Sequence, residues 1–166
     1  MKFEKGDLII YGETGVCRVE DIVPRVFLDK EQLCYKLSPV YQSCLIFTPV
    51  EGSNVSMRPV ISRENAETLI KNVSSVPPSN YSVSSPRELS AKYDTIIKSL
   101  DFNQWLELFV SIRTKKEIAI SNKKKVSAID ERYGKKSEEL LYGELAAALR
   151  VTKAEVALRL EEELSR

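Results

Sequence analysis

The spacing of apolar residues changes near residue 75 and divides the chain into two parts. Before this point, apolar residues alternate with polar ones or form short runs that Gly, Pro and Asn interrupt, which is typical of β-strands. After it, apolar residues recur at intervals of three and four, which is typical of amphipathic helices. The pattern therefore predicts an α+β protein in which a strand-rich module precedes a helical module.

The first part contains five short stretches with strand character, at residues 7–11, 16–23, 33–37, 44–47 and 57–60. Gly12 to Gly15 supplies the first turn, and Pro24 either ends regular pairing or places its segment on a sheet edge. Five short strands within some 60 residues favour a small, strongly bent barrel. Ser62 is a candidate cap for a helix that runs through Ile70, and we expect the first domain to span residues 1–71.

Residues 72–85 carry no charged side chain and include two prolines and six serines. This composition predicts a linker, because the segment is too polar and too often interrupted by proline to form a core element. The second domain is then expected to span residues 86–166.

The second part predicts a bundle of four or five antiparallel helices joined by short loops. One helix follows the capping box that begins at Ser85, with Pro86 at its first position. Two more are expected to begin at the caps Ser127 and Thr152. Trp105 lies within an apolar stripe that runs from Phe102 to Ile112, so we expect it in the core.

The net charge of +1 conceals a basic middle segment. Residues 76–136 carry 12 basic and 7 acidic side chains, whereas the flanking segments are net acidic. The basic residues are densest at 113–116, 123–125 and 135–136. Such a segment can contact nucleic-acid phosphates, or it can form solvated helix ends whose lysines oppose the helix dipole. Charge alone leaves both interpretations open.

The side chains used most often in catalysis and metal binding are scarce. The chain has no histidine, and its three cysteines form no C-x-x-C pair. No phosphate-binding G-K-[ST] follows Gly12 to Gly15, and no serine lies in G-x-S-x-G. We therefore expect no catalytic residue, no metal and no cofactor, and we interpret Cys17, Cys34 and Cys44 as small buried hydrophobes.

No window approaches 18 consecutive apolar residues, so no membrane span is expected. The first 15 residues lack a basic start followed by an apolar run, so no secretory signal is expected either. We therefore expect a cytoplasmic protein.

Several short motifs appear in an order that resembles one family. Phe3-x-x-Gly6-Asp7-x-x-Ile10-Tyr11 and Gly15-Val16-x-x-Val19-Glu20-x-Ile22 resemble the start of the CarD/CdnL transcription regulators. Tyr35-x-Leu37, Ile46-x-x-Pro49 and Met57-Arg58-x-Val60-Ile61-Ser62 follow in the order of that family. Val126-Ser127-x-x-Asp130, then Leu140-Leu141 and Glu144-Leu145-Ala146, resemble its helical carboxyl-terminal module. The family shares its first module with the RNA polymerase-interacting domain of transcription-repair coupling factor.

For the first module, the resemblance implies a Tudor-like or SH3-like five-stranded barrel that grips the β subunit of bacterial RNA polymerase. Docking would occur by pairing a strand edge with the partner's sheet. The implied polymerase-facing residues are Arg25, Phe47 and Pro49. Phe47 occupies a position where relatives can carry arginine, which makes an apolar contact available in place of a charged one.

For the helical module, the resemblance implies contact with promoter DNA near the melted region. Relatives carry a tryptophan wedge before the first long helix, where this sequence has Pro86, and the nearest aromatic residue is Tyr81. Contacts to the DNA backbone could come instead from Arg87 and from Lys123, Lys124 and Lys125.

Taken together, these features predict a non-enzymatic bacterial transcription regulator that acts as a monomer. It would bind the polymerase β subunit through its first module and modulate promoter complexes through its second. One alternative is a protein–protein adaptor of the same architecture that makes no DNA contact. An enzyme with an unrecognised site is a second alternative, and a deep pocket with convergent carboxylates would support it.

Overall fold

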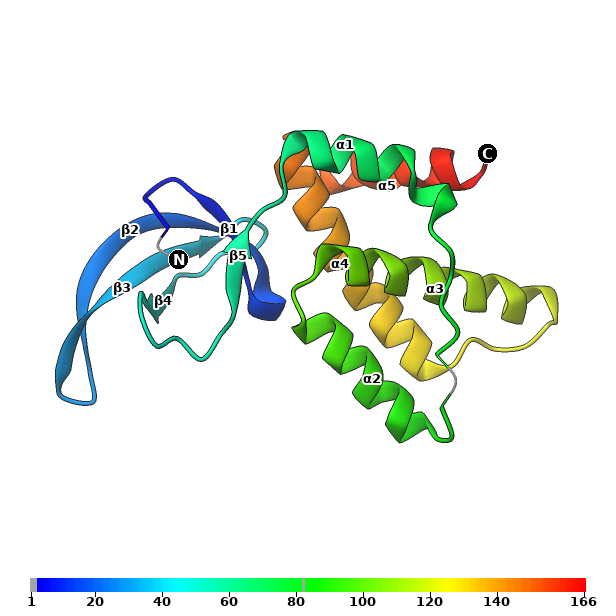
Figure 1. The fold of residues 1–166 in the computed structure, drawn as a ribbon, viewed down its shortest axis with the longest axis horizontal. Helices are drawn as coiled ribbons and strands as arrows, with labels where there is room; N and C mark the ends of the chain where they lie inside the picture. The colour runs from blue at the N-terminus through cyan, green and yellow to red at the C-terminus, as the bar shows by residue number, and fades with distance from the viewer. Residues whose placement is uncertain (1–2, 82) are drawn as a thin grey trace. The chain divides into compact units, whose positions relative to one another are not determined.

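The computed structural model describes residues 3–81 and 83–166. The chain divides into two compact units, Met1–Ile61 and Ser62–Arg166. The first holds the strands and the second holds the five α-helices, so the α+β architecture predicted from the sequence is confirmed (Figure 1).

The first unit is a five-stranded antiparallel sheet with the strand order β4-β3-β2-β1-β5. Its strands are β1 (Leu8–Tyr11), β2 (Gly15–Phe27), β3 (Lys30–Pro39), β4 (Ile46–Pro49) and β5 (Met57–Pro59). Each predicted strand is present, and β2 and β3 are longer than expected. A short 3-10 turn, Gly12–Thr14, joins β1 to β2. Gly12 has a φ of +47°, and a Cβ there would lie 2.7 Å from a Val55 methyl group, so only glycine fits this turn.

Strands β2 and β3 form a long hairpin that extends beyond the rest of the sheet (Figure 1). Its two turn residues, Leu28 and Asp29, both have positive φ angles, as a tight hairpin turn that matches the strand twist requires. Pro24 does not end β2, because the strand continues to Phe27 with Pro24 opposite Leu33. The edge interpretation of Pro24 holds instead, since β1 pairs only with residues 15–18 of β2.

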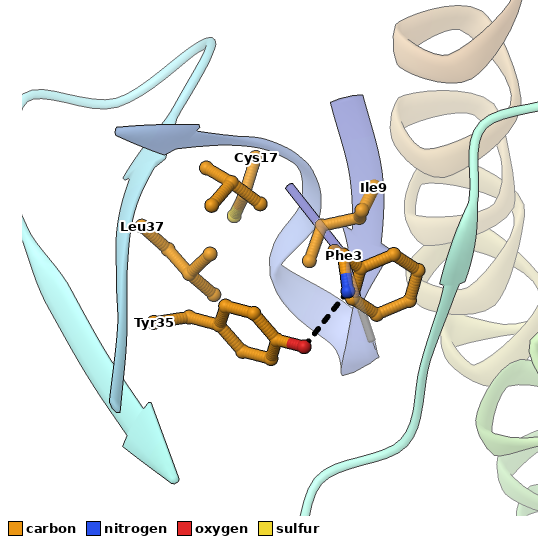
Figure 2. Close-up of a cluster of buried hydrophobic side chains, with 6 residues drawn as sticks. Phe3, Ile9, Cys17, Tyr35 and Leu37 are labelled. Atoms are coloured by element: carbon orange, nitrogen blue, oxygen red, sulfur yellow. Dashed lines mark hydrogen bonds between the residues drawn. The ribbon is translucent and has the colours of Figure 1, made fainter. Parts of the chain in front are cut away.

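The core of the first unit lies on one face of this sheet. Figure 2 shows Phe3, Ile9, Cys17, Tyr35 and Leu37 packed together, all of them buried. The hydroxyl of Tyr35 is fully buried and accepts a hydrogen bond of 2.8 Å from the backbone N–H of Phe3. This bond satisfies the one polar atom of the buried ring and ties the start of the described chain to β3.

The second unit contains α1 (Arg63–Lys71), α2 (Pro86–Lys98), α3 (Phe102–Ser121), α4 (Ala128–Leu149) and α5 (Lys153–Leu164). The predicted caps are confirmed, because each cap side chain accepts a hydrogen bond from a backbone N–H in the first turn of its helix. These caps are Ser62, Ser85, Ser127 and Thr152. Trp105 is fully buried in α3, as expected, and its indole N–H donates to the carbonyl of Ile97 at 3.1 Å.

Helix α1 packs within the second unit, whereas the sequence placed it with the first. It contacts α4 and α5, and Glu67 of α1 forms an ion pair with Arg159 of α5. Ala66 and Ile70 are buried on its inner face. The amphipathic pattern of α1 specifies which of its faces is covered but not which neighbouring element covers it.

Residues 73–81, in the segment that the sequence presented as a linker, lie against the helices of the second unit. Val73 is buried next to α5, and the backbone N–H of Ser79 donates to the Ser111 hydroxyl of α3 at 2.8 Å. Tyr81 packs edge-on against Tyr93 of α2, with ring centroids 5.6 Å apart. The composition of the segment did not predict this packing, because the contacts are made by a few apolar side chains and by backbone hydrogen bonds within a segment that is polar on average.

Candidate functional site

The three residues that the resemblance assigns to polymerase binding share one face of the sheet. Arg25 of β2 lies opposite Gln32 of β3, and Phe47 and Pro49 of β4 lie opposite Lys36 and Cys34. Because side chains alternate along a strand, all of these residues project from the face opposite to the buried Tyr35 and Leu37. The register therefore brings Arg25, Phe47 and Pro49 together on the outer face.

Arg25 and Phe47 are in direct contact across β3. The guanidinium carbon of Arg25 lies 4.0 Å from the centroid of the Phe47 ring, a cation–π geometry. Cys34 lies between them in register and is fully buried although it belongs to the outer face. A small side chain at position 34 leaves room for Arg25 to reach over β3 to the ring.

This contact holds the Arg25 side chain without neutralising its charge. Arg25 is exposed, and no acidic side chain within residues 3–81 and 83–166 forms an ion pair with it. Its N–H donors therefore remain available to an acidic partner group. A phenylalanine at position 47 supports the guanidinium of Arg25, where an arginine would repel it.

Strand β4 is an edge of the sheet, so its outer side is available for pairing. The N–H of Val50 donates to the carbonyl of Leu33 at 3.0 Å, which makes this pair a hydrogen-bonded one. Bonded and non-bonded pairs alternate along an antiparallel ladder, so the Phe47–Lys36 pair is non-bonded. The N–H and carbonyl of Phe47 consequently point away from β3, toward the open side.

The second long open edge, on β2 beyond residue 20, is blocked at two positions. The N–H of Ile22 is taken by the Asp21 carboxylate at 2.8 Å. Pro24 has no N–H to offer. Natural sheets use such devices to prevent edge pairing. On β4, Pro49 likewise lacks an N–H at the outward-facing position that follows Phe47, so the N–H of Phe47 and the carbonyls of Phe47 and Pro49 are the groups that this edge offers.

In the helical unit, the basic stretch at 113–116 is engaged in ion pairs within the protein. Lys115 contacts the buried carboxylate of Asp130 at 3.0 Å, and Lys116 pairs with Glu131 at 3.6 Å. Arg113 forms a bidentate ion pair with Glu161 of α5, which raises the pKa of the guanidinium. The sequence presented these residues as a possible phosphate-contacting surface, but their charges are largely compensated here.

The stretch at 123–125 differs, because its lysines are exposed and form no ion pair with any described residue. Lys123, Lys124 and Lys125 lie in the connection between α3 and α4. Arg87 is exposed in the first turn of α2. These four cations can therefore still meet phosphates.

Side-chain contacts hold the middle of α2 against the first half of α4, so the two helices run side by side (Figure 1). The Tyr133 hydroxyl donates to Asp94 at 2.6 Å, and Arg132 donates to the Ser90 hydroxyl at 3.0 Å. Arg132 is exposed and its guanidinium lies over the Tyr133 ring, so it is a further candidate cation. The sequence did not single out Arg132, because the acidic Asp130 and Glu131 directly before it make the local net charge negative.

Neither candidate for an aromatic DNA wedge is free to act as one. Trp105 is fully buried, and Tyr81 packs on Tyr93 while Lys92 lies over its ring at 5.4 Å. Burial also raises the pKa of the Tyr81 hydroxyl. Any DNA contact by this unit would depend on its cations.

The cysteines agree with expectation at two of three positions. Cys17 and Cys34 are buried, whereas Cys44 is exposed, so its interpretation as a buried hydrophobe is wrong. Cys44 lies in the irregular segment before β4, where the predicted strand begins two residues later than expected. Burial raises the pKa of the Cys17 thiol to about 11, so this thiol is unreactive at neutral pH.

Within residues 3–81 and 83–166, no cluster of three His, Cys, Asp or Glu side chains is arranged to hold a metal ion. In that same part of the chain, no helix combines the length and the hydrophobicity that a membrane crossing needs.

Comparison with known families assigns the first unit. Residues 3–61 match a family model for a domain that interacts with RNA polymerase, which supports RNA polymerase as a partner of the first unit. The family is the CarD-like/TRCF RID domain family, so the resemblance seen in the sequence is confirmed for this unit. A search of curated proteins finds no significant match.

Proposed function

We propose that the first unit binds the β subunit of bacterial RNA polymerase through the outer edge of β4 and the adjacent outer face. The backbone groups of Phe47 would pair with a strand of the partner, and Arg25 would meet an acidic side chain beside that strand. The observation that carries this proposal is an unpaired strand edge next to an uncompensated arginine, on a domain of the RNA polymerase-interacting class.

We propose further that the helical unit modulates promoter complexes by contacting the DNA backbone. Arg87, Lys123, Lys124 and Lys125 would neutralise phosphates without reading sequence. The protein would act in the bacterial cytoplasm as a monomeric regulator without catalytic activity.

Capture of RNA polymerase β subunit by the full chain tests the first proposal. Arg25→Glu should weaken capture by about tenfold or more, because it removes a donor and places a carboxylate beside the acidic partner group. Arg18→Glu makes the same charge change on an exposed position of the same strand and should leave capture unchanged. Equal capture by the wild type and Arg25→Glu would remove Arg25 from the interface.

A second candidate is an adaptor of the same architecture that makes no DNA contact. The buried Trp105 and the packed Tyr81 favour it, because the helical unit then has no exposed aromatic wedge of the kind that relatives use. Fluorescence anisotropy with promoter duplex across a salt series separates the two candidates. If DNA is bound, replacing Lys123, Lys124 and Lys125 by glutamine should lower the log–log salt slope by up to about 3. Absence of DNA binding by the wild type at low salt would support the adaptor.

A further inference from the structure

The core-side face of the β2–β3 hairpin remains apolar beyond the point where the core ends. Ile22, Pro24 and Val26 of β2 and Leu33 of β3 lie on the same face as the buried Tyr35, because Ile22 pairs with Tyr35 and Pro24 with Leu33. Ile22, Val26 and Leu33 are nevertheless 37%, 70% and 56% exposed. We call Ile22, Pro24, Val26 and Leu33 the hairpin strip.

The hairpin strip is apolar where a solvent-facing strand would ordinarily alternate to polar residues. The opposite face of the same hairpin is mixed, since Asp21 and Arg25 of β2 alternate there with Val23 and Phe27. A contiguous exposed apolar face on a hairpin marks an interaction surface.

The free edge of β2 beside the hairpin strip is closed to strand addition, since Asp21 blocks one N–H and Pro24 lacks another. A partner would therefore pack side chains onto the strip rather than extend the sheet. A small pocket lined by Gln32, Leu33, Val50 and Glu51 adjoins the strip and could receive one apolar side chain.

The charges around the hairpin strip are acidic. Glu31 lies directly opposite Val26, and Glu51 lines the pocket beside Leu33. Between residues 22 and 26 of β2 and residues 31 and 33 of β3, this face carries no lysine or arginine. The surface thus complements an apolar segment that carries basic side chains.

We propose that the hairpin strip docks an apolar, lysine- or arginine-bearing segment of RNA polymerase, as a second contact next to the β4 edge. This inference rests on the proposed polymerase binding: Arg25 lies between Pro24 and Val26 in the same strand, so the strip and the proposed Arg25 contact are on opposite faces of one hairpin. The hairpin would then contact the enzyme with both of its faces. The outer face would contribute the charge of Arg25, and the core-side face would contribute the apolar strip with Glu31 beside it.

The test measures binding of core RNA polymerase to the immobilised full chain by biolayer interferometry. The double variant Val26→Ser/Leu33→Ser should raise Kd by about tenfold or more, because two apolar side chains lose their burial in the complex. Leu158→Ser is the matched control, since it replaces an exposed apolar residue of α5 in the other unit, and it should leave Kd unchanged.

Glu31→Lys tests the acidic rim and should weaken binding several-fold at low salt, with the difference shrinking as salt rises. Unchanged Kd for Val26→Ser/Leu33→Ser, with weakened binding for Arg25→Glu, would overturn the hairpin strip and leave the proposed function standing. Failure of the wild type to bind polymerase would overturn the proposed function itself.

Sedimentation of the same variants distinguishes a second copy of the chain as the occupant. A wild-type dimer that Val26→Ser/Leu33→Ser converts to a monomer, with polymerase affinity unchanged, would also overturn the proposal. A monomeric wild type with weakened polymerase binding by the double variant supports it.

Discussion

Replacing Lys115 by methionine tests whether the basic stretch at 113–116 stabilises the helical unit rather than serving a ligand. The Lys115 ammonium lies 3.0 Å from the Asp130 carboxylate and 3.2 Å from the Tyr93 hydroxyl, which itself donates to Asp130 at 2.8 Å. This cluster joins α2, α3 and α4. Methionine keeps an apolar side chain of similar length and removes the charge together with the N–H donors of the ammonium group.

The magnitude follows from the burial of the two partners. Breaking a fully buried ion pair costs about 3–5 kcal/mol, because a charge is left without compensation. The Asp130 side chain is 7% exposed, but that of Lys115 is 41% exposed, so water replaces part of the lost interaction. Asp130 also keeps the Tyr93 hydroxyl as a donor. We therefore expect Lys115→Met to lower the free energy of unfolding by about 1–2 kcal/mol.

Urea unfolding followed by Trp105 fluorescence measures this change, because Trp105 is the single tryptophan and lies buried in the same unit. Lys123→Met is the control, since Lys123 is exposed, and its effect should stay within about 0.5 kcal/mol. The double variant Lys115→Met/Asp130→Asn should be less destabilised than the sum of its parts by about 1 kcal/mol. An unchanged midpoint for Lys115→Met, or strict additivity in the double variant, would refute the reasoning.

Three further predictions concern other parts of the chain. Tyr35→Phe leaves a buried backbone N–H without its acceptor and should destabilise the first unit by about 1–3 kcal/mol in thermal unfolding. Native-state alkylation should label Cys44 rapidly and spare Cys17, and labelling of both thiols at equal rates would contradict this. The free energy of unfolding of the first unit should also fall above about pH 9, because the pKa of Cys17 in the folded protein, about 11, lies above its unfolded value. Arg159 lowers the pKa of Glu67, so the ion pair stabilises the folded protein above the unfolded pKa of Glu67, and this stabilisation is lost as pH falls through the lower folded value. Glu67→Gln should therefore reduce the fall in the free energy of unfolding over this acidic pH range in pH-dependent thermal unfolding.

The sequence alone determined the elements whose signals are local. The caps at Ser62, Ser85, Ser127 and Thr152 specified where helices begin, because a cap needs only a side-chain oxygen and the next three residues. The alternating pattern before residue 60 specified strands, and the ordered motifs specified the family of the first unit.

Only the tertiary structure decided which elements share a unit. Helix α1 and the segment that follows it belong to the helical unit, although α1 comes directly after the last strand in the chain. An amphipathic pattern shows which side of a helix is buried but not which element covers it, and a few apolar residues in a loop show even less. The sequence could therefore not assign α1 or the segment after it to one of the two units.

For the candidate binding residues, too, the sequence supplied the residue types and the fold supplied their arrangement. The family resemblance named Arg25, Phe47 and Pro49, but their position on one face depends on the register of three strands and on the bulge in β2 between Val19 and Asp21. The stacking of Arg25 on Phe47 depends also on the small Cys34 between them. Which lysines remain free likewise depends on pairing between distant helices, such as Lys115 with Asp130. The residue type determines which groups a side chain can bind, but the strand register and helix packing determine which groups lie within reach of it.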